Sequence, residues 1–418
     1  MGLSAKLRGE LARADARLAI VGAGIAGVQA AAFARKSGFS GEIVLIGEEV
    51  GAPYDRPTLS KQVLQDAGTE TKIALRPEGF YEEARIELVA GRKVAALDRE
   101  RQRLTFAGGG EIGYTALILA TGSAPRTLAG FEPGAPNLFY LRDLGHSLAL
   151  RSALAGGARL ALIGGGIIGL EAAAAGVKAG VAVTIIEAAP RVLTRAASPA
   201  LAEHLAAAHR EQGVDIRCGV TVASAEHGAA GWRLALADGE RVEADIVLVG
   251  VGVAARTQLA ADARLAVTPL GVTADAFGAT SDERIFAAGE VAWHFNAFRG
   301  RQERQENWFH AAAHGEHIGA ALFADTDAYG ELGGYWTDQY DIHLQTVGAP
   351  IGESDIVRGA MVEGHFIIYH LVGGVVVGAS AVNAPRELRA AKTLIGERAQ
   401  PDPRRLADPS CDLAKVAA

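Results

Sequence analysis

Two glycine-rich motifs of the form G-x-G-x-x-G constrain this chain more than any other feature. The glycines are Gly22, Gly24 and Gly27 in the first motif, and Gly164, Gly166 and Gly169 in the second. Each motif follows a short apolar run and precedes an alanine-rich stretch, which predicts a strand, a tight turn and a helix. In such a unit the N–H groups of the helix N-terminus face the phosphates of a bound nucleotide.

An acidic residue follows the second predicted strand of each unit. Glu48 comes after the apolar residues 43–46, and Glu187 comes after residues 183–186. A carboxylate at this place accepts hydrogen bonds from ribose hydroxyls, as in folds that bind dinucleotides. Two complete motifs therefore predict two bound dinucleotides, and the simplest use of two is electron transfer between them.

Composition excludes several other classes of protein. The chain has 418 residues, of which 49% are hydrophobic and 21% charged, so it can bury a large core. Its net charge of −7 argues against nucleic acid as the main partner. No apolar run approaches the roughly 18 to 20 residues of a membrane span, and residues 1–16 lack the apolar segment of a secretion signal. We expect a cytoplasmic protein that does not enter a membrane.

The cysteines and histidines predict neither a redox-active disulfide nor a metal site. Cys218 and Cys411 are the only cysteines, and they lie far apart in the sequence, so we interpret Cys218 as a structural thiol. His310, His314 and His317 have helical spacing that a metal could use. Electron transfer between dinucleotides needs no metal there, and we expect none.

The order of the predicted elements is a repeat followed by a different pattern. Strand and helix signals of the first unit end near residue 122, and those of the second unit end near residue 250. From about residue 331 short alternating strands appear, which indicate a smaller antiparallel domain. The sequence thus predicts an α/β protein with two Rossmann-like dinucleotide-binding domains and a smaller α+β C-terminal domain.

Four further segments carry a resemblance to a known family. They are residues 286–290 (FAAGE), 53–61 (PYDRPTLSK), 306–308 (ENW) and 335–339 (YWTDQ). Together with the two glycine motifs they resemble the FAD-dependent ferredoxin reductases of bacterial oxygenase systems, within the glutathione-reductase superfamily. The resemblance implies an FAD domain formed by residues 1–122 and 252–330, an NAD domain at 123–251 and a C-terminal domain at 331–418.

The same resemblance implies a function and its partners. Electrons would pass from NADH through FAD to a small acidic [2Fe-2S] ferredoxin, which serves an oxygenase of the P450 or Rieske type. Rubredoxin reductase and monodehydroascorbate reductase are alternatives within the enzymes. A non-enzymatic flavoprotein related to apoptosis-inducing factor is an alternative from another class.

The resemblance also assigns residues to each cofactor. The FAD residues are Gly22, Gly24, Ala26, Gly27, Glu48, Arg56, Lys61, Val94, Thr121, Gly122, Arg142, Glu290 and Trp308. The NAD residues are Gly164, Gly166, Ile168, Gly169 and Glu187. The family usually has Asp at the position of Glu290, whose carboxylate would bind a ribityl hydroxyl. The longer side chain leaves the form of that contact open.

Lys61 and Glu171 are the candidate catalytic residues. Reduced flavin carries negative charge, so a cation beside the ring favours reduction, and the protein's role is to position and tune the cofactors. The resemblance implies that Lys61 and Glu171 pair beside the flavin. The alternatives are an ordinary surface lysine and an ordinary acid on a helix surface.

A basic run offers a candidate docking surface for the carrier. Arg299, Arg301 and Arg304 precede Trp308, and an arginine patch would steer an acidic ferredoxin. Trp336 is interpreted either as a flavin-edge residue near that surface or as a core aromatic of the third domain. The alternative for the basic run is a solvated face without a partner.

Overall fold

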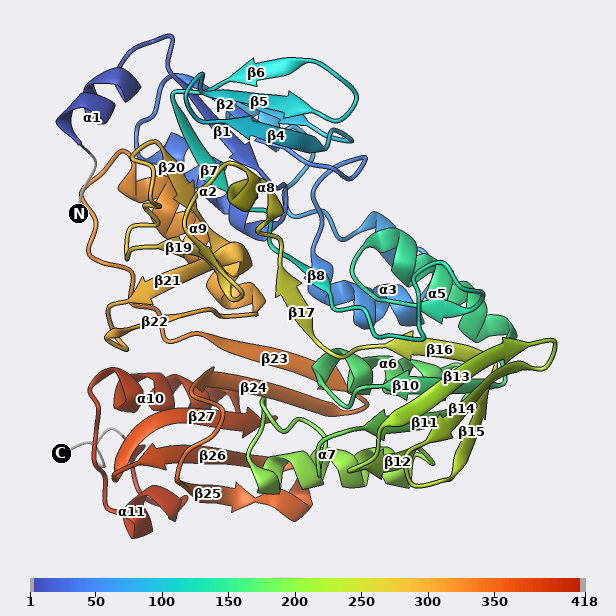
Figure 1. Cartoon of the computed structure of the whole chain (residues 1–418). Helices are drawn as coiled ribbons and strands as arrows, with labels where there is room; N and C mark the ends of the chain where they lie inside the picture. Colours follow the sequence, from blue (N-terminus) through green and yellow to red (C-terminus); the bar gives the residue numbers. More distant parts are fainter. Residues whose placement is uncertain (1–3, 414–418) are drawn as a thin grey trace. The chain divides into compact units, whose positions relative to one another are not determined.

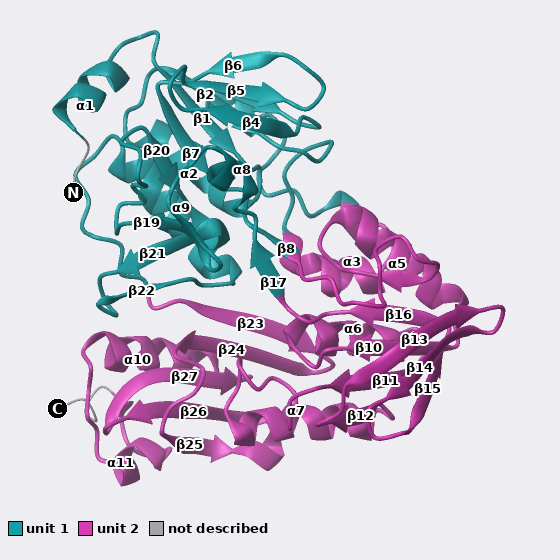
Figure 2. Ribbon diagram, viewed as in Figure 1, with its two compact units in different colours: residues 1–55, 71–124, 253–331 teal, residues 56–70, 125–252, 332–418 magenta. Residues whose placement is uncertain are grey.

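The computed structural model describes residues 4–413, which divide into two units (Figure 2). Unit 1 comprises residues 1–55, 71–124 and 253–331, and unit 2 comprises residues 56–70, 125–252 and 332–418. The predicted domain ends at residues 1 and 418 lie outside the described residues. Each unit is described by itself.

Unit 1 is organised around a five-stranded parallel sheet with the strand order β20-β7-β1-β2-β3 (Figure 1). Its strands are β1 (Arg17–Val21), β2 (Glu42–Ile46), β3 (Ile86–Val89), β7 (Ala116–Leu119) and β20 (Ile285–Ala287). The central strands are almost continuously apolar and buried, as expected for a parallel sheet covered on both faces. The first glycine motif follows β1 directly, so it lies at the carboxyl edge of the sheet.

Two helices of unit 1, α2 (Ile25–Lys36) and α9 (Trp308–Ala321), pack closely because small residues line their contact. A Cβ atom on Gly315 would come within 2.2 Å of the Ala26 carbonyl oxygen, and one on Gly319 would meet the Ala30 carbonyl at the same distance. Only glycine allows this approach of the two backbones. The close packing of α2 against α9 therefore fixes where the N-termini of the two helices lie.

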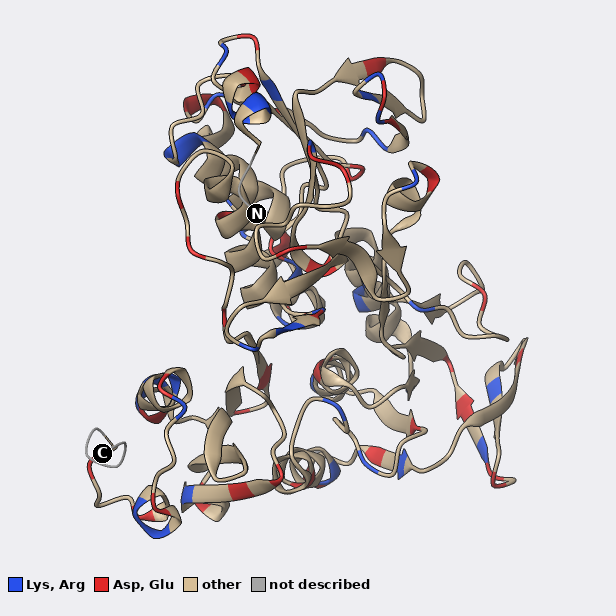
Figure 3. Cartoon of the chain, turned by 60° about the vertical axis from the view of Figure 1, so that its left-hand side comes forward, with Lys and Arg blue, Asp and Glu red and all other residues tan. Residues whose placement is uncertain are grey.

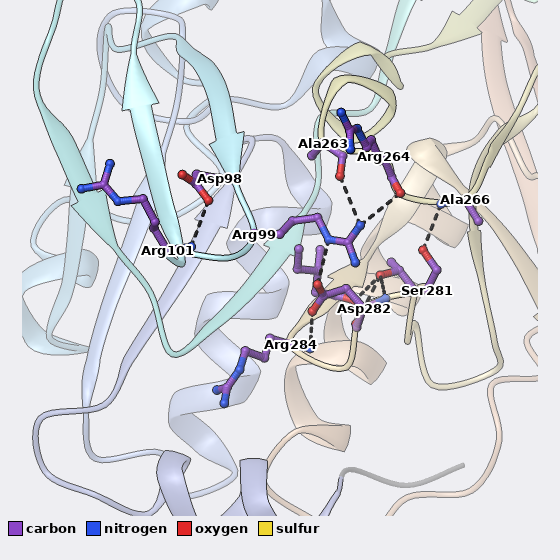
Figure 4. Close-up of polar contacts among 11 residues, drawn as sticks. Asp98, Arg99, Arg101, Ala263, Arg264, Ala266, Ser281, Asp282 and Arg284 are labelled. Atoms are coloured by element: carbon purple, nitrogen blue, oxygen red, sulfur yellow. Dashed lines mark hydrogen bonds and ion pairs between the residues drawn. The ribbon is translucent and has the colours of Figure 1, made fainter.

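An antiparallel sheet and a mixed sheet complete unit 1, and an arginine joins its separate sequence segments. The strands are β4 (Val94–Asp98), β5 (Arg103–Phe106) and β6 (Glu111–Gly113) in one sheet, and β18 (Val267–Thr268), β19 (Gly271–Ala274), β21 (Ala292–Asn296) and β22 (Arg301–Glu303) in another. Arg99 follows β4 and donates to the Asp282 carboxylate at 2.8 Å and to the carbonyls of Ala263 and Arg264 (Figure 4). Residues 71–124 and 253–331 are thus bound into one unit. Short helices α1 (Ala5–Leu11), α4 (Phe80–Glu83) and α8 (Gln258–Asp262) also belong to it.

Unit 2 contains a second five-stranded parallel sheet with the order β12-β11-β10-β16-β9. Its strands are β9 (Leu138–Phe139), β10 (Arg159–Ile163), β11 (Ala182–Glu187), β12 (Asp215–Cys218) and β16 (Ile246–Val249). Helices α5 (Leu144–Gly156), α6 (Ile167–Lys178) and α7 (Pro199–Glu211) and an antiparallel sheet of β13 (Val222–Gly228), β14 (Gly231–Leu236) and β15 (Arg241–Ala244) accompany it. The second glycine motif occupies the β10–α6 turn, which matches the β1–α2 turn of unit 1.

The C-terminal part of unit 2 is an antiparallel sheet with the order β23-β24-β27-β26-β25. The strands are β23 (Gly334–Gln339), β24 (Ile342–Gly348), β25 (Ser354–Ala360), β26 (His365–Val372) and β27 (Val375–Val382), followed by α10 (Pro385–Gly396) and α11 (Pro403–Ala407). Strand β23 contacts α6, so this sheet packs on the helix that carries the second glycine motif.

The predicted α/β class, with two Rossmann-like sheets and a smaller α+β part, is confirmed. Residues 56–70 pack in unit 2, because Ser147 and Arg151 of α5 donate to the carbonyls of Leu59 and Val63 at 2.7 and 2.8 Å. The division into three domains by cofactor stays a prediction. Among residues 4–413 no helix is long and apolar enough to cross a membrane.

Candidate active site

The first glycine motif fits the pyrophosphate of a dinucleotide. Gly22 has φ +115°, and a Cβ atom there would lie 2.1 Å from the Ala120 carbonyl oxygen. A Cβ on Gly27 would lie 1.9 Å from the Gly22 carbonyl, so the helix and the strand turn touch. Gly24 is the N-cap of α2, and no side chain caps the helix there. A Cβ atom added at Gly24 would have no neighbour within 4 Å. The first turn of α2 therefore presents backbone N–H groups to open space, which suits phosphate oxygens.

Glu48 lies just beyond β2, where a ribose-binding carboxylate is expected. Arg256 donates to both of its oxygens, with one distance of 2.9 Å and one shorter contact. The Thr121 hydroxyl in turn donates to the Arg256 carbonyl at 2.9 Å. The predicted FAD residues Glu48 and Thr121 are thus linked through an arginine that the sequence did not single out. No pattern distinguished Arg256 from the other arginines, because its partner lies 208 positions away.

The remaining predicted FAD residues of unit 1 are Ala26, Val94, Gly122, Glu290 and Trp308. The Glu290 carboxylate accepts a short hydrogen bond from Ser123, so the extra methylene is compatible with an ordered carboxylate. Trp308 is the first residue of α9, and the preceding Asn307 caps the helix by accepting from the His310 N–H at 2.8 Å. Val94 begins β4. Ala26 lies within the glycine motif, in the first turn of α2, and Gly122 follows β7.

The interpretation of Arg304 as an exposed charge on a docking surface is wrong. Its side chain is 4% exposed, donates to the Glu290 carbonyl at 2.8 Å and pairs with Glu306 at 2.7 Å. These two bonds direct the guanidinium inward. Arg301 is 66% exposed and lies 3.9 Å from Glu303. Trp336 belongs to unit 2, whereas the arginines belong to unit 1.

The second glycine motif repeats the geometry of the first. Gly164 has φ +109°, and its Cβ position lies 2.4 Å from the Gly250 carbonyl oxygen. Gly166 caps α6 and has no atom within 4 Å of its Cβ position, and Gly169 again contacts the strand turn. Ile168 in the first turn of α6 is 42% exposed, which leaves it available to a ligand. This motif also fits a dinucleotide.

Glu187 at the end of β11 is held by the backbone. One carboxylate oxygen accepts from the Gly165 N–H at 2.6 Å, and the other accepts from the Ala189 N–H at 2.7 Å. Each carboxylate oxygen has further acceptor capacity for a ribose hydroxyl. The fixed orientation supports the predicted role of Glu187 toward NAD.

Lys61 and Glu171 form a buried ion pair in unit 2. Lys61 Nζ lies 2.8 Å from Glu171 Oε1, and the two side chains are 7% and 2% exposed. Thr337 donates to the same carboxylate oxygen at 2.6 Å, and Ser60 makes a short hydrogen bond to the other. The ammonium group also lies 5.5 Å from the centre of the Trp336 ring, within the range of a cation–π contact. The interpretations of Lys61 and Glu171 as surface residues are therefore wrong.

Ser60 and Thr337 were missed as members of this site, although both lie inside segments that carried the resemblance. Their hydroxyls satisfy the carboxylate that Lys61 alone would leave partly unpaired, and a buried carboxylate needs such donors. Arg56 and Arg142, both predicted at the flavin, also lie in unit 2. Arg56 donates to the Arg142 carbonyl at 2.8 Å.

A cluster of buried histidines lies behind the start of α9. It comprises His294, His310 and His314, and one ring nitrogen from each lies within 4.8 Å of those of the other two. Burial lowers the pKa of all three below the usual value, so the rings are neutral, as metal ligands are. The His294 and His310 rings are stacked, with planes 15° apart. The expectation of no metal stays a prediction.

A Ser–His–Asp arrangement in the C-terminal sheet is structural. His370 Nδ1 lies 2.8 Å from Asp355, and His370 Nε2 lies 2.9 Å from the Ser380 hydroxyl. Both His370 and Ser380 have no exposed surface, so the hydroxyl is closed to any substrate. A second bond from Ser380 to Thr346 completes a buried hydrogen-bond network.

Two dinucleotide-binding motifs and a buried lysine–glutamate pair define a flavoprotein oxidoreductase of the two-dinucleotide class. The sequence profile described as pyridine nucleotide-disulphide oxidoreductase matches residues 16–315, and that described as reductase C-terminal matches residues 335–417. The chain belongs to the pyridine nucleotide-disulphide oxidoreductase family. It is an FAD-dependent oxidoreductase that uses NAD(H).

Relatives and solved structures agree with this assignment. The chain is 40% identical over 396 residues to the ferredoxin–NAD(+) reductase component of the anthranilate 1,2-dioxygenase system of Burkholderia cepacia, covering 94% of this chain and 97% of the relative. It is 36% identical to putidaredoxin reductase of Pseudomonas putida over 97% of both chains. The crystal structure of the ferredoxin reductase for the CYP199A2 system from Rhodopseudomonas palustris is similar, with a TM-score of 0.92, 33% identity and coverage of 96% and 100%. The covalent putidaredoxin reductase–putidaredoxin complex gives a TM-score of 0.92, 34% identity and coverage of 97% and 98%.

Proposed function

We propose that the chain is a cytoplasmic NADH-dependent ferredoxin reductase, which passes electrons from NADH through FAD to a small [2Fe-2S] ferredoxin of an oxygenase system. The observation that carries the proposal is the buried Lys61–Glu171 pair, in the unit that also holds the NAD-type motif. Cys218 and Cys411, the only cysteines, are both free, so no dithiol takes up the electrons. The relatives named as ferredoxin reductases support a one-electron iron–sulfur acceptor.

Some residues of the chain bind the two dinucleotides, and others adjust how readily the flavin is reduced. The two glycine motifs bind the pyrophosphates through backbone N–H groups, and Glu48 and Glu187 bind the riboses. When bound, FAD supplies the chemistry that accepts two electrons from NADH and releases them singly. The Lys61 ammonium favours the build-up of negative charge on reduction, and Glu171 keeps that ammonium in place.

The alternatives are not favoured. Rubredoxin reductase, monodehydroascorbate reductase and a flavoprotein like apoptosis-inducing factor share the fold, but relatives matching nearly the whole chain serve dioxygenase systems or putidaredoxin. Basic and acidic positions are both spread along the chain, as Figure 3 shows, and the net charge is −7, which does not favour a nucleic acid as the partner.

Anaerobic stopped-flow absorbance tests the proposal. We expect NADH to bleach the flavin of the holoenzyme and a [2Fe-2S] ferredoxin to restore its colour within the same rapid mixing experiment. Lys61→Met should slow bleaching by about 10-fold or more, because the uncompensated Glu171 carboxylate then opposes reduction. Rapid bleaching followed by slow reoxidation with every ferredoxin and rubredoxin would contradict the proposal and favour the non-enzymatic alternative.

Arg301 offers a test of where the carrier docks. Arg301→Glu should slow ferredoxin reduction roughly 3- to 10-fold at low salt, because an exposed charge at a contact rim mainly changes the association rate. Salt should shrink the difference as the Debye length falls to about 8 Å near 0.15 M. Arg241→Glu, an exposed arginine on β15, is the matched control and should have no effect. Equal loss of NADH-to-ferricyanide activity would show that Arg301 serves the fold instead.

A further inference from the structure

A buried series of side-chain hydrogen bonds leads from the surface of unit 2 to the Glu171 carboxylate. The His209 series, as we name it, consists of Tyr340, His209, Gln339 and Thr337. Successive distances are 2.8 Å from the Tyr340 hydroxyl to His209 Nδ1, 2.8 Å from His209 Nε2 to Gln339 Oε1, 3.0 Å from Gln339 Nε2 to Thr337 Oγ1 and 2.6 Å from Thr337 Oγ1 to Glu171 Oε1. Tyr340 is 37% exposed, whereas His209, Gln339 and Thr337 are at most 1% exposed.

The carboxylate at one end fixes the direction of every bond in the His209 series. An ionised Glu171 only accepts, so the Thr337 hydroxyl donates to it and itself accepts from the Gln339 amide. The Gln339 oxygen then accepts from His209, which places the imidazole proton on Nε2. His209 Nδ1 is left as the acceptor for Tyr340. All donors point toward Glu171, and the dipoles add in its favour.

The histidine in this series is neutral. Burial lowers the pKa of His209 below its usual value, and one proton on the ring is what the two hydrogen bonds require. The Gln339 amide separates His209 from Thr337, and an amide neither takes up nor releases a proton at ordinary pH. The series therefore orients groups and does not conduct protons.

We propose that His209 is a positioning residue for the Lys61–Glu171 pair, acting through Gln339 and Thr337. Helix α7 and strand β23 then fix the Glu171 carboxylate through Oε1, the oxygen that Lys61 also contacts. Ser60 holds the other oxygen, Oε2. Resting on the proposed function, the consequence is that the His209 series affects reduction of the flavin by NADH and leaves the transfer to ferredoxin unchanged.

Nuclear magnetic resonance of the wild-type holoenzyme tests the geometry without any substitution. In protein labelled with ¹⁵N in its histidine rings, His209 should give the signals of a neutral ring protonated at Nε2. The His209→Gln variant identifies those signals by their loss. A neutral ring protonated at Nδ1, or a charged ring at pH 7, would overturn the proposal.

Two matched pairs of variants test the effect on Glu171. Glutamine keeps a donor near the position of Nε2, so His209→Gln should bleach with NADH within about 2-fold of wild type, and His209→Met should be about 3- to 10-fold slower. Thr337→Ser and Thr337→Val should differ in the same way. The ferredoxin-dependent reoxidation rate should be equal in both His209 variants.

The outcomes separate this proposal from the proposed function. If NADH fails to bleach the wild type, the proposed function is wrong. If the wild type is bleached and each pair of variants behaves alike, His209 is a core residue only and the positioning role is wrong. Thermal unfolding identifies any variant that fails to fold. If a His209 variant fails to fold, the Thr337 pair and the resonance measurement on the wild type test the positioning role instead.

Discussion

At the scale of single residues, we expect Glu187 to decide which coenzyme the chain uses. Its two oxygens are fixed by the N–H groups of Gly165 and Ala189, so the carboxylate cannot swing away from an added phosphate. The neighbouring Arg191 bonds to carbonyls of its own loop, at 3.4 Å to Val192 and Leu193. We therefore expect NADH to be preferred over NADPH by roughly 10- to 100-fold in kcat/KM, about 1.4 to 2.8 kcal/mol.

Steady-state kinetics with both coenzymes check this preference. Glu187→Ala should narrow the ratio by removing the repulsion of the 2′-phosphate. Glu187→Gln keeps the size of the side chain and removes its charge, so it should narrow the ratio as well, although its NH2 group can no longer accept from one of the two backbone N–H groups. Equal efficiencies with the two coenzymes in the wild type would contradict the role assigned to Glu187.

The contrast between Glu187 and Arg256 shows how far single residues can be predicted from sequence. Glu187 lies a fixed distance after a glycine motif, and local βαβ geometry dictates where such an acid lies. Arg256 reaches Glu48 from a distant segment, and no periodicity or motif marks that contact. Arg304 carried the right charge for a docking surface, but its inward direction depends on Glu290 and Glu306.

At the scale of elements, one arginine holds the C-terminal helix against the sheet. Arg358 of β25 is 8% exposed and donates to four carbonyls that follow or end α11. The acceptors are the carbonyls of Leu406 at 3.3 Å, Asp408 at 2.6 Å, Pro409 at 3.1 Å and Cys411 at 2.8 Å. The Leu406 carbonyl is one that the helix end leaves without an internal partner, and the other three lie in the segment that follows α11. Arg358→Met should lower the free energy of unfolding by about 1.5 to 3 kcal/mol.

Urea denaturation and limited proteolysis measure this effect. The segment after residue 402 should be cleaved faster in Arg358→Met than in the wild type. Arg404→Met, at an exposed arginine in α11 itself, is the control and should change stability little. If the two variants denature alike, the carbonyls are satisfied by other groups and Arg358 does not secure the helix.

Elements were predicted well where the pattern is local. The strand–glycine–helix units and the alternating C-terminal strands follow from hydrophobic periodicity and turn residues. The His209 series was not predicted, because it joins α7 to residues in and after β23 across 130 positions. The Lys61–Glu171 pair was predicted only through the resemblance, since the two residues lie 110 positions apart and each alone looks like a surface charge.

At the scale of the whole molecule, both units bury neutral histidines, and this makes stability depend on pH. Burial lowers the pKa below the ordinary 6.5 for seven histidines, which are His204, His209, His294, His310, His314, His317 and His370. For His310 and His314 the neighbouring histidine rings lower the pKa further. In the unfolded chain these rings take up protons near pH 6.5, whereas in the folded chain they do so only at lower pH.

The unfolded state therefore binds more protons as the pH falls below about 6.5, and acid favours unfolding. The stabilisation is fully present above pH 6.5 and is lost below it, by up to about 1.4 kcal/mol per pH unit for each histidine. Urea midpoints of the holoenzyme with excess FAD should be level between pH 8 and 7 and should fall between pH 6 and 5. Carboxylates with lowered pKa, such as Asp143 and Asp245, lose their stabilisation only near pH 4 and below, so they do not account for this window. A midpoint that stays constant from pH 8 to 5 would show that the buried histidines accept protons without unfolding.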